Sequence, residues 1–172
     1  LAFRPGSATW PRPVFNPDQV TCKTPAVNHQ VGSGYNTEHQ WVCCQEQERQ
    51  RLYLEEHASL LLIDYLNREL EQEVRIVYQN DHFVALVPFW AVWPFEAIIL
   101  PRRPVPSIDR FTDHETRGFA DAYRRLTQAY DRVFDCEFPY TAGIHQAPAT
   151  SENHDCWQLH MHFYPPLLRS AI

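Results

Sequence analysis

Two histidines on alternate residues near the end of the chain are the first side chains that could do chemistry. His160 and His162 lie in the stretch 155–166, which is predicted to be a strand. Successive side chains of a strand point to opposite faces, so both imidazoles would share one face with Gln158, and the apolar residues between them would face a core. Two imidazoles placed in this way can bind one metal ion together, or one can act as a nucleophile supported by the other.

A third histidine and a carboxylate could complete a metal site if the fold brings them to this strand. His145 lies at the end of another predicted strand, and Glu46 lies in a predicted helix. Three neutral imidazoles and one carboxylate suit zinc or ferrous iron, whereas calcium and magnesium prefer more oxygen ligands. Four protein ligands would close a tetrahedral coordination sphere, which favours a structural ion.

A nucleophilic role for His160 is the alternative. A neutral imidazole can attack the α-phosphorus of a nucleotide and form a covalent nucleotidyl-histidine. The two roles exclude each other, because a nitrogen that binds a metal ion cannot attack phosphorus. The residues alone leave both possibilities open.

The predicted helices would position these side chains. Residues 45–70 are rich in Glu, Gln, Arg and Leu and contain no Gly or Pro, which predicts a helix with a break at 57–59. Glu46 would then lie in the first turn, where a carboxylate suits the helix dipole. Residues 112–115 fit a capping box and predict the start of a second helix, whose apolar residues recur at three- and four-residue intervals up to Val133.

Five segments have the composition of strands. The first two would form a hairpin through the turn residues 79–81. The order of helix, three strands, helix and two strands predicts an α+β fold with an antiparallel sheet of about five strands. The predicted strands are 74–78, 82–88, 96–101, 140–145 and 155–166.

Composition limits the partners and the organisation of the chain. With 172 residues and a net charge of −6, it fits one domain and is a poor partner for nucleic acid or an anionic membrane surface. No apolar run is long enough for membrane insertion. Five cysteines without C-x-x-C spacing predict a reducing, cytoplasmic location, with an organelle after processing as the alternative.

Residues 1–41 contain five prolines and three of the five glycines and are predicted to be an irregular arm, followed by one domain at 42–172.

Several longer motifs resemble one protein family. Residues 77–83, 98–101 and 158–162 resemble the histidine-triad (HIT) fold, and residues 41–172 as a whole resemble the second HIT-like half of galactose-1-phosphate uridylyltransferases. The motifs that carry this resemblance are 87–96, 138–140, 143–148 and 157–171.

The resemblance implies a HIT-like α+β fold and a metal site. In this family the second half binds one structural iron or zinc ion through one glutamate and three histidines. Those positions correspond here to Glu46, His145, His160 and His162. The resemblance therefore favours metal binding over nucleophilic attack for His160.

The resemblance also implies an activity and its partners. Family members are homodimers in galactose metabolism that transfer UMP between UDP-glucose and galactose 1-phosphate through a uridylyl-histidine. This implies a nucleotidyltransferase with a UDP-hexose and a hexose 1-phosphate as ligands.

The sequence departs from the family pattern at the nucleophile. The family's His-Pro-His-x-Gln strand is missing, residues 28–31 are its nearest remnant, and the chain ends before the segment that contacts the hexose phosphate. No catalytic residue is therefore assigned, with His160 as the weaker candidate in a HIT-type hydrolase. The alternative function is a catalytically degenerate, metal-stabilised subunit of a larger assembly.

Overall fold

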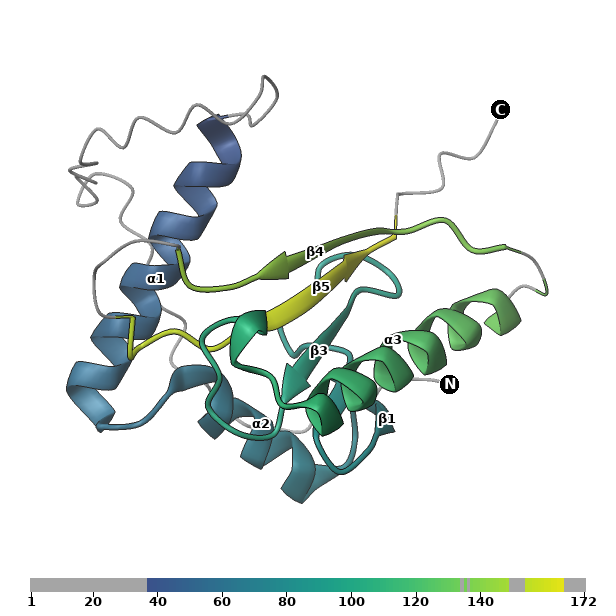
Figure 1. Ribbon diagram of the computed structural model, residues 1–172. Helices are drawn as coiled ribbons and strands as arrows, with labels where there is room; N and C mark the ends of the chain where they lie inside the picture. Colours follow the sequence, from purple (N-terminus) through teal and green to yellow (C-terminus); the bar gives the residue numbers. More distant parts are fainter. Residues whose placement is uncertain (1–36, 134, 136, 149–153, 166–172) are drawn as a thin grey trace. The chain divides into compact units, whose positions relative to one another are not determined.

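The computed structural model describes residues 37–133, 135, 137–148 and 154–165 (Figure 1). Most of the predicted arm, including the remnant at 28–31, lies outside the described residues, as do the last residues, 166–171, of the motif at 157–171. The helices are α1 (Thr37–His57), α2 (Leu61–Gln72) and α3 (Asp113–Val133). The strands are β1 (Ile76–Gln79), β2 (Phe83–Leu86), β3 (Ala97–Pro101), β4 (Thr141–His145) and β5 (His160–Tyr164). None of these helices is long and apolar enough to cross a lipid bilayer.

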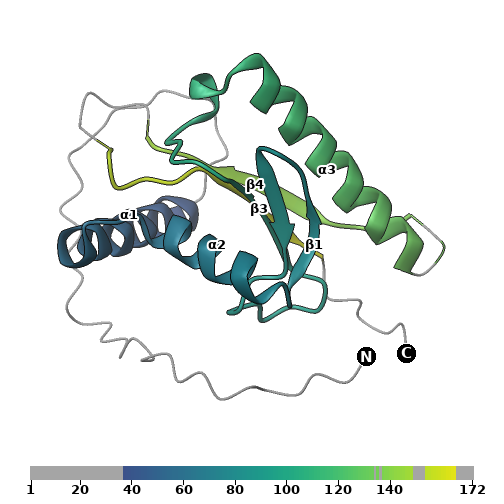
Figure 2. The ribbon, with the colours of Figure 1, turned by 90° about the horizontal axis from the view of Figure 1, so that it is seen from below.

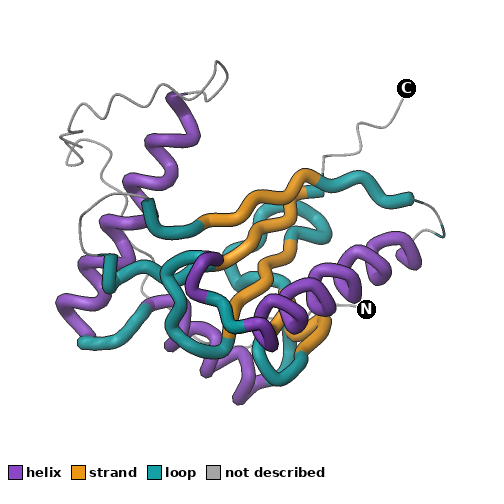
Figure 3. Tube along the Cα trace, in the orientation of Figure 1, coloured by secondary structure: helices purple, strands orange, loops and turns teal. Residues whose placement is uncertain are grey.

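The five strands form one antiparallel sheet in the order β1-β2-β3-β5-β4 (Figure 3). This confirms the predicted hairpin of β1 and β2, with β3 as the third neighbour. It also places β4 beside β5, so that His145 lies opposite His160. Segments separated by a helix or a long loop in the sequence therefore become neighbours in the sheet.

The sheet is covered by helices on both faces (Figure 2). Apolar residues of α3, including Leu126 and Tyr130, pack on one face together with Phe163. The α2 helix packs on the other face, against a cluster that contains Ile98. His162 pairs with Ile98, and paired residues of antiparallel strands point to the same face, so the histidines lie on the α2 side.

The first helical segment differs from the prediction in its start. The α1 helix begins at Thr37, so residues 37–41 are helical and Glu46 lies in the interior of the helix instead of its first turn. No Gly or Pro interrupts residues 37–44, and the helix continues back through them. The predicted break is confirmed, because Ala58 has a positive φ of 52° and α2 begins at Leu61.

The last strand is shorter than the stretch predicted for it. Residues 157–159 lie before β5 and contact the loop after β3. The Leu159 N–H donates to the carbonyl oxygen of Val105 at 2.7 Å, and the Val105 N–H donates to Gln158 Oε1 at 3.1 Å. The side-chain amide of Gln158 therefore accepts the hydrogen bond from Val105 that a backbone carbonyl would accept in a continuous strand pair.

The capping box at the start of α3 is confirmed. The Glu115 N–H donates to Thr112 Oγ1 at 3.3 Å, and the Thr112 N–H donates to Glu115 Oε2 at 2.8 Å. The helix ends at Val133, which was predicted to lie on its apolar face but is 43% exposed, so the prediction is wrong at this residue.

Glu115 also forms an ion pair with Arg103, and this pair predicts an acid-dependent loss of stability. Hydrogen bonds from Arg103 outweigh the effect of burial and lower the pKa of Glu115 to about 2. A carboxyl group with a lowered folded-state pKa stabilises the fold above its ordinary pKa of 4.5 and loses this effect as pH falls towards 2. We expect Glu115→Gln to lower the free energy of unfolding by about 1–2 kcal/mol at pH 7, because Arg103 is half exposed and solvent screens the pair.

Denaturant unfolding between pH 7 and pH 2.5 tests this expectation. The difference between the variant and the unaltered chain should shrink below pH 4.5. A difference that stays constant over this range would contradict it. Glu71→Gln, an exposed residue of α2, serves as the control.

Candidate metal centre

The three histidines of the predicted site meet on one face of the β4–β5 pair. His145 ends β4, and His160 and His162 lie on β5. The centroids of the rings of His145 and His160 lie 4.9 Å apart, and His162 lies 5.0 Å from each of them. One nitrogen from each ring lies within 4.8 Å of the others. This spacing allows all three rings to bind a single ion.

Glu46 brings a carboxylate to the same cluster from α1. Its Oε2 lies 2.8 Å from His145 Nδ1, and its Oε1 lies 2.7 Å from His160 Nε2. One carboxylate therefore contacts histidines on two different strands. The structure brings together all four residues that the sequence assigned to the site.

The cluster is largely buried, and burial determines its charge state. His160 is 1% exposed and His162 is 8% exposed. Burial, together with the neighbouring His160 and His145, lowers the pKa of His162 to about 3. Burial would raise the pKa of Glu46, but hydrogen bonds with His145 and His160 outweigh it and hold this pKa at about 2. At neutral pH His162 is a neutral imidazole and Glu46 is a carboxylate.

One polar atom of the cluster lacks a partner among the described residues. His162 Nδ1 is buried without a hydrogen bond. The ring stacks on Tyr164 with a centroid distance of 5.2 Å and an interplanar angle of 9°. A buried ring nitrogen without a partner costs free energy, and an ion within reach of the cluster would remove part of this cost. Neutral imidazoles and a carboxylate are also the forms that bind zinc or iron, so the residues fit such an ion.

Both nitrogens of His160 have contacts inside the protein. Nδ1 lies 2.9 Å from the carbonyl oxygen of Gln158, and Nε2 faces Glu46. Nucleophilic attack on phosphorus would need a nitrogen that a substrate can reach, whereas His160 is 1% exposed. This geometry supports a ligand role for His160 over the nucleophilic alternative.

Gln50 is a residue of this region that the sequence reasoning missed. It is buried on α1, and its Oε1 accepts a hydrogen bond from the Gln158 N–H at 2.9 Å. Its position four residues after Glu46 places both side chains on one face of the helix, which is the signal that could have identified it. Gln158, predicted to share the face of the histidines, directs its side chain to the backbone of 103–105.

Comparison with known proteins identifies the family. Residues 46–172 match the model for "Galactose-1-phosphate uridyl transferase, C-terminal domain". The chain belongs to the galactose-1-phosphate uridylyltransferase family. The resemblance inferred from the sequence motifs is thereby confirmed.

Individual family members have similar sequences over the same part of the chain. The galactose-1-phosphate uridylyltransferase of Haemophilus influenzae is 47% identical over 126 residues, which cover 73% of this chain and 36% of the relative. The enzyme of Kluyveromyces lactis is 50% identical over 121 residues, covering 69% of this chain and 33% of the relative. This chain therefore spans about a third of the length of these relatives.

Solved structures agree with this assignment. A uridylyltransferase structure superposes with a TM-score of 0.67 at 30% identity, covering 72% of this chain and 38% of that one. An ADP-glucose phosphorylase from Arabidopsis thaliana superposes with a TM-score of 0.62 at 20% identity and shows the shared fold alone. The predicted α+β, HIT-like fold is confirmed.

Proposed function

We propose that this chain is the metal-binding, HIT-like part of a galactose-1-phosphate uridylyltransferase. Glu46, His145, His160 and His162 would together hold one zinc or iron ion. The observation that supports this best is the contact of one carboxylate with two histidines, beside a third whose buried Nδ1 has no partner among the described residues. The sequence identity to named uridylyltransferases provides independent support.

The ion would have a structural role. Four protein ligands fill the coordination sphere of a tetrahedral ion, which leaves no position for water or substrate. When bound, the ion supplies a positive charge that joins the carboxylate of α1 to the imidazoles of β4 and β5. The residues themselves fix the site, since β4 and β5 pair with each other and Glu46 already contacts both strands.

The proposed reaction is transfer of UMP between UDP-glucose and galactose 1-phosphate. The names of the relatives support galactose 1-phosphate as the acceptor. This chain contributes the scaffold and the metal site, while the nucleophilic histidine has no assigned position in it. Assaying transfer of labelled UMP to galactose 1-phosphate tests the activity directly. The cytoplasmic location and the homodimer remain predictions.

A second function is favoured by one observation in the sequence. No His-Pro-His-x-Gln segment occurs in residues 1–172, so the chain by itself would act as a metal-stabilised subunit of a larger assembly. Labelled UMP transfer by the purified chain alone would contradict this second function. Stoichiometric metal without transfer would support it.

Metal removal gives a prediction that does not depend on the activity. We expect the purified chain to contain about one zinc or iron ion per molecule, because the cluster offers one complete set of ligands. Removing the ion with a chelator should lower the melting temperature by roughly 10 °C, and adding zinc should restore it. Elemental analysis and calorimetry measure both effects, and a chain that folds equally well with negligible metal would contradict the prediction.

A further inference from the structure

Gln50 is buried on α1 close to the candidate metal centre. It is 1% exposed, and it lies one helical turn after Glu46 on the same face of the helix. Its Nε2 is buried without a hydrogen-bond partner among the described residues. An unpaired buried amide costs free energy, so an apolar side chain would fill this space better if packing were its only role. A role for the other polar atom of the side chain, Oε1, would explain a glutamine at this position.

That other atom connects Gln50 to a candidate ligand through two hydrogen bonds. Gln50 Oε1 accepts from the backbone N–H of Gln158 at 2.9 Å. The carbonyl oxygen of the same residue, Gln158, lies 2.9 Å from His160 Nδ1 and can only accept, so Nδ1 carries the proton. With Nδ1 used as the donor to Gln158, Nε2, which faces Glu46, is the nitrogen left for an ion to bind in place of a proton.

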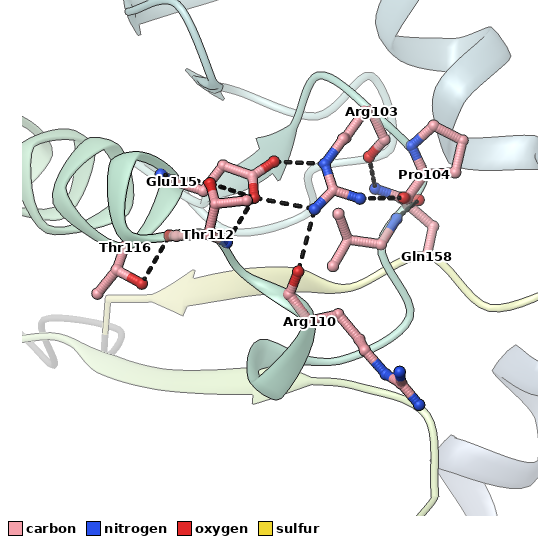
Figure 4. Close-up of polar contacts among 8 residues, drawn as sticks. Arg103, Pro104, Arg110, Thr112, Glu115, Thr116 and Gln158 are labelled. Carbon is pink, nitrogen blue, oxygen red and sulfur yellow. Dashed lines mark hydrogen bonds and ion pairs between the residues drawn. The ribbon is translucent and has the colours of Figure 1, made fainter.

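The side chain of Gln158 is also held by the loop at 103–105 (Figure 4). Its Oε1 accepts from the Val105 N–H at 3.1 Å, and its Nε2 donates to the Arg103 carbonyl oxygen at 3.1 Å. The Arg103 side chain is anchored by Glu115 and by the carbonyl oxygen of Arg110 at 3.0 Å. The loop at 103–105 thus fixes the side chain of Gln158, and Gln50 fixes its backbone relative to α1.

We propose that Gln50 is a positioning residue for the metal centre. Through the backbone of Gln158 it holds His160 in the tautomer that presents Nε2 and keeps α1, which carries Glu46, in register with β5. This inference rests on the proposed metal site. Residues that orient metal-binding histidines typically change metal affinity by about 10- to 100-fold when they are replaced.

Gln50→Met tests the proposal, because methionine has a similar volume and no strong acceptor. We expect zinc affinity, measured by competition with a chromophoric chelator, to fall about 10- to 100-fold. The visible absorption spectrum of the cobalt-loaded protein should also change, because the orientation of His160 changes. A residue with only a packing role would alter stability without altering this spectrum.

Gln47→Met is the matched control. Gln47 lies on the same helix, and its Nε2 lies 3.4 Å from His154 Nδ1. His154 is not one of the four candidate ligands, and this contact does not involve the backbone of Gln158. It should keep the zinc affinity and the cobalt spectrum of the unaltered chain. Equal affinity and identical spectra for Gln50→Met and the unaltered chain would overturn the proposal.

Gln50→Glu serves if the methionine variant does not fold. It retains an acceptor oxygen at the same position and should bind zinc at least as tightly as the unaltered chain. A tenfold loss of affinity in this variant would overturn the proposal. These outcomes are separate from failure of the metal site itself, in which the unaltered chain would bind neither zinc nor cobalt.

Discussion

The Glu46→Gln variant is expected to retain less than about a tenth of the bound metal and to unfold at a temperature about 10 °C lower. Glutamine has nearly the same shape as glutamate but lacks the negative charge. The carboxylate contacts His145 through Oε2 and His160 through Oε1, so its loss affects both strands of the site. Without the anion, three neutral imidazoles would have to hold the ion alone.

The size of this effect follows from coupling between metal binding and folding. An ion that binds only the folded chain stabilises it in proportion to the logarithm of its concentration over its dissociation constant. A weaker site therefore lowers metal content and melting temperature together. Elemental analysis after gel filtration and differential scanning calorimetry measure the two quantities on the same sample.

Glu48→Gln is the control for this experiment. Glu48 lies on the same helix two residues later, half exposed, and pairs with Arg51 instead of a histidine. Surface ion pairs of this kind contribute about 0–1 kcal/mol, so metal content should not change. If Glu46→Gln kept one ion per chain, the assignment of Glu46 as a ligand would be wrong.

The Phe163→Ala variant is expected to lose about 3–5 kcal/mol of unfolding free energy, the usual cost of truncating a buried phenylalanine. Phe163 is fully buried on β5, on the face covered by α3. Its ring contacts Tyr140 at a centroid distance of 5.5 Å and Tyr123 at 5.7 Å. Removing the ring leaves a cavity in this aromatic cluster.

The metal content of the folded Phe163→Ala variant should remain at the level of the unaltered chain. Adjacent side chains of a strand point to opposite faces, so Phe163 and the neighbouring His162 lie on different sides of the sheet. Chemical denaturation with and without chelator separates the contribution of core packing to stability from that of the bound ion. Ile144→Ala, at a position that is 42% exposed, should change stability by less than about 0.5 kcal/mol and serves as the control. Complete metal loss from folded Phe163→Ala would contradict this independence of the two faces.

Local features of the fold were readable from the sequence because they depend on neighbouring residues. The capping box of Thr112 and Glu115 and the break near Ala58 involve residues within a few positions of one another. The hairpin of β1 and β2 follows from two β-rich segments joined by a short turn. The alternating histidines on β5 likewise place two imidazoles on one face by geometry alone.

The complete site was predicted from the sequence through a family resemblance, since spacing alone could not supply it. Glu46 and His145 are 99 residues apart, so no local pattern indicates that they meet. Composition even placed Glu46 in a first helical turn, whereas the helix begins at Thr37. Residue types made the four residues candidates, and the resemblance assigned them to one site without giving their contacts.

The tertiary structure decided how these residues are held. The register of β4 against β5 sets His145 opposite His160, and the packing of α1 brings Glu46 between them. The link from Gln50 to His160 passes through the backbone of Gln158, which is 108 residues from Gln50 in the sequence. The sequence by itself determined which elements form and which side chains share a face, because these depend on short-range backbone geometry. The distances between the candidate ligands arise only when separate elements pack together, because each is the sum of many contacts along the chain.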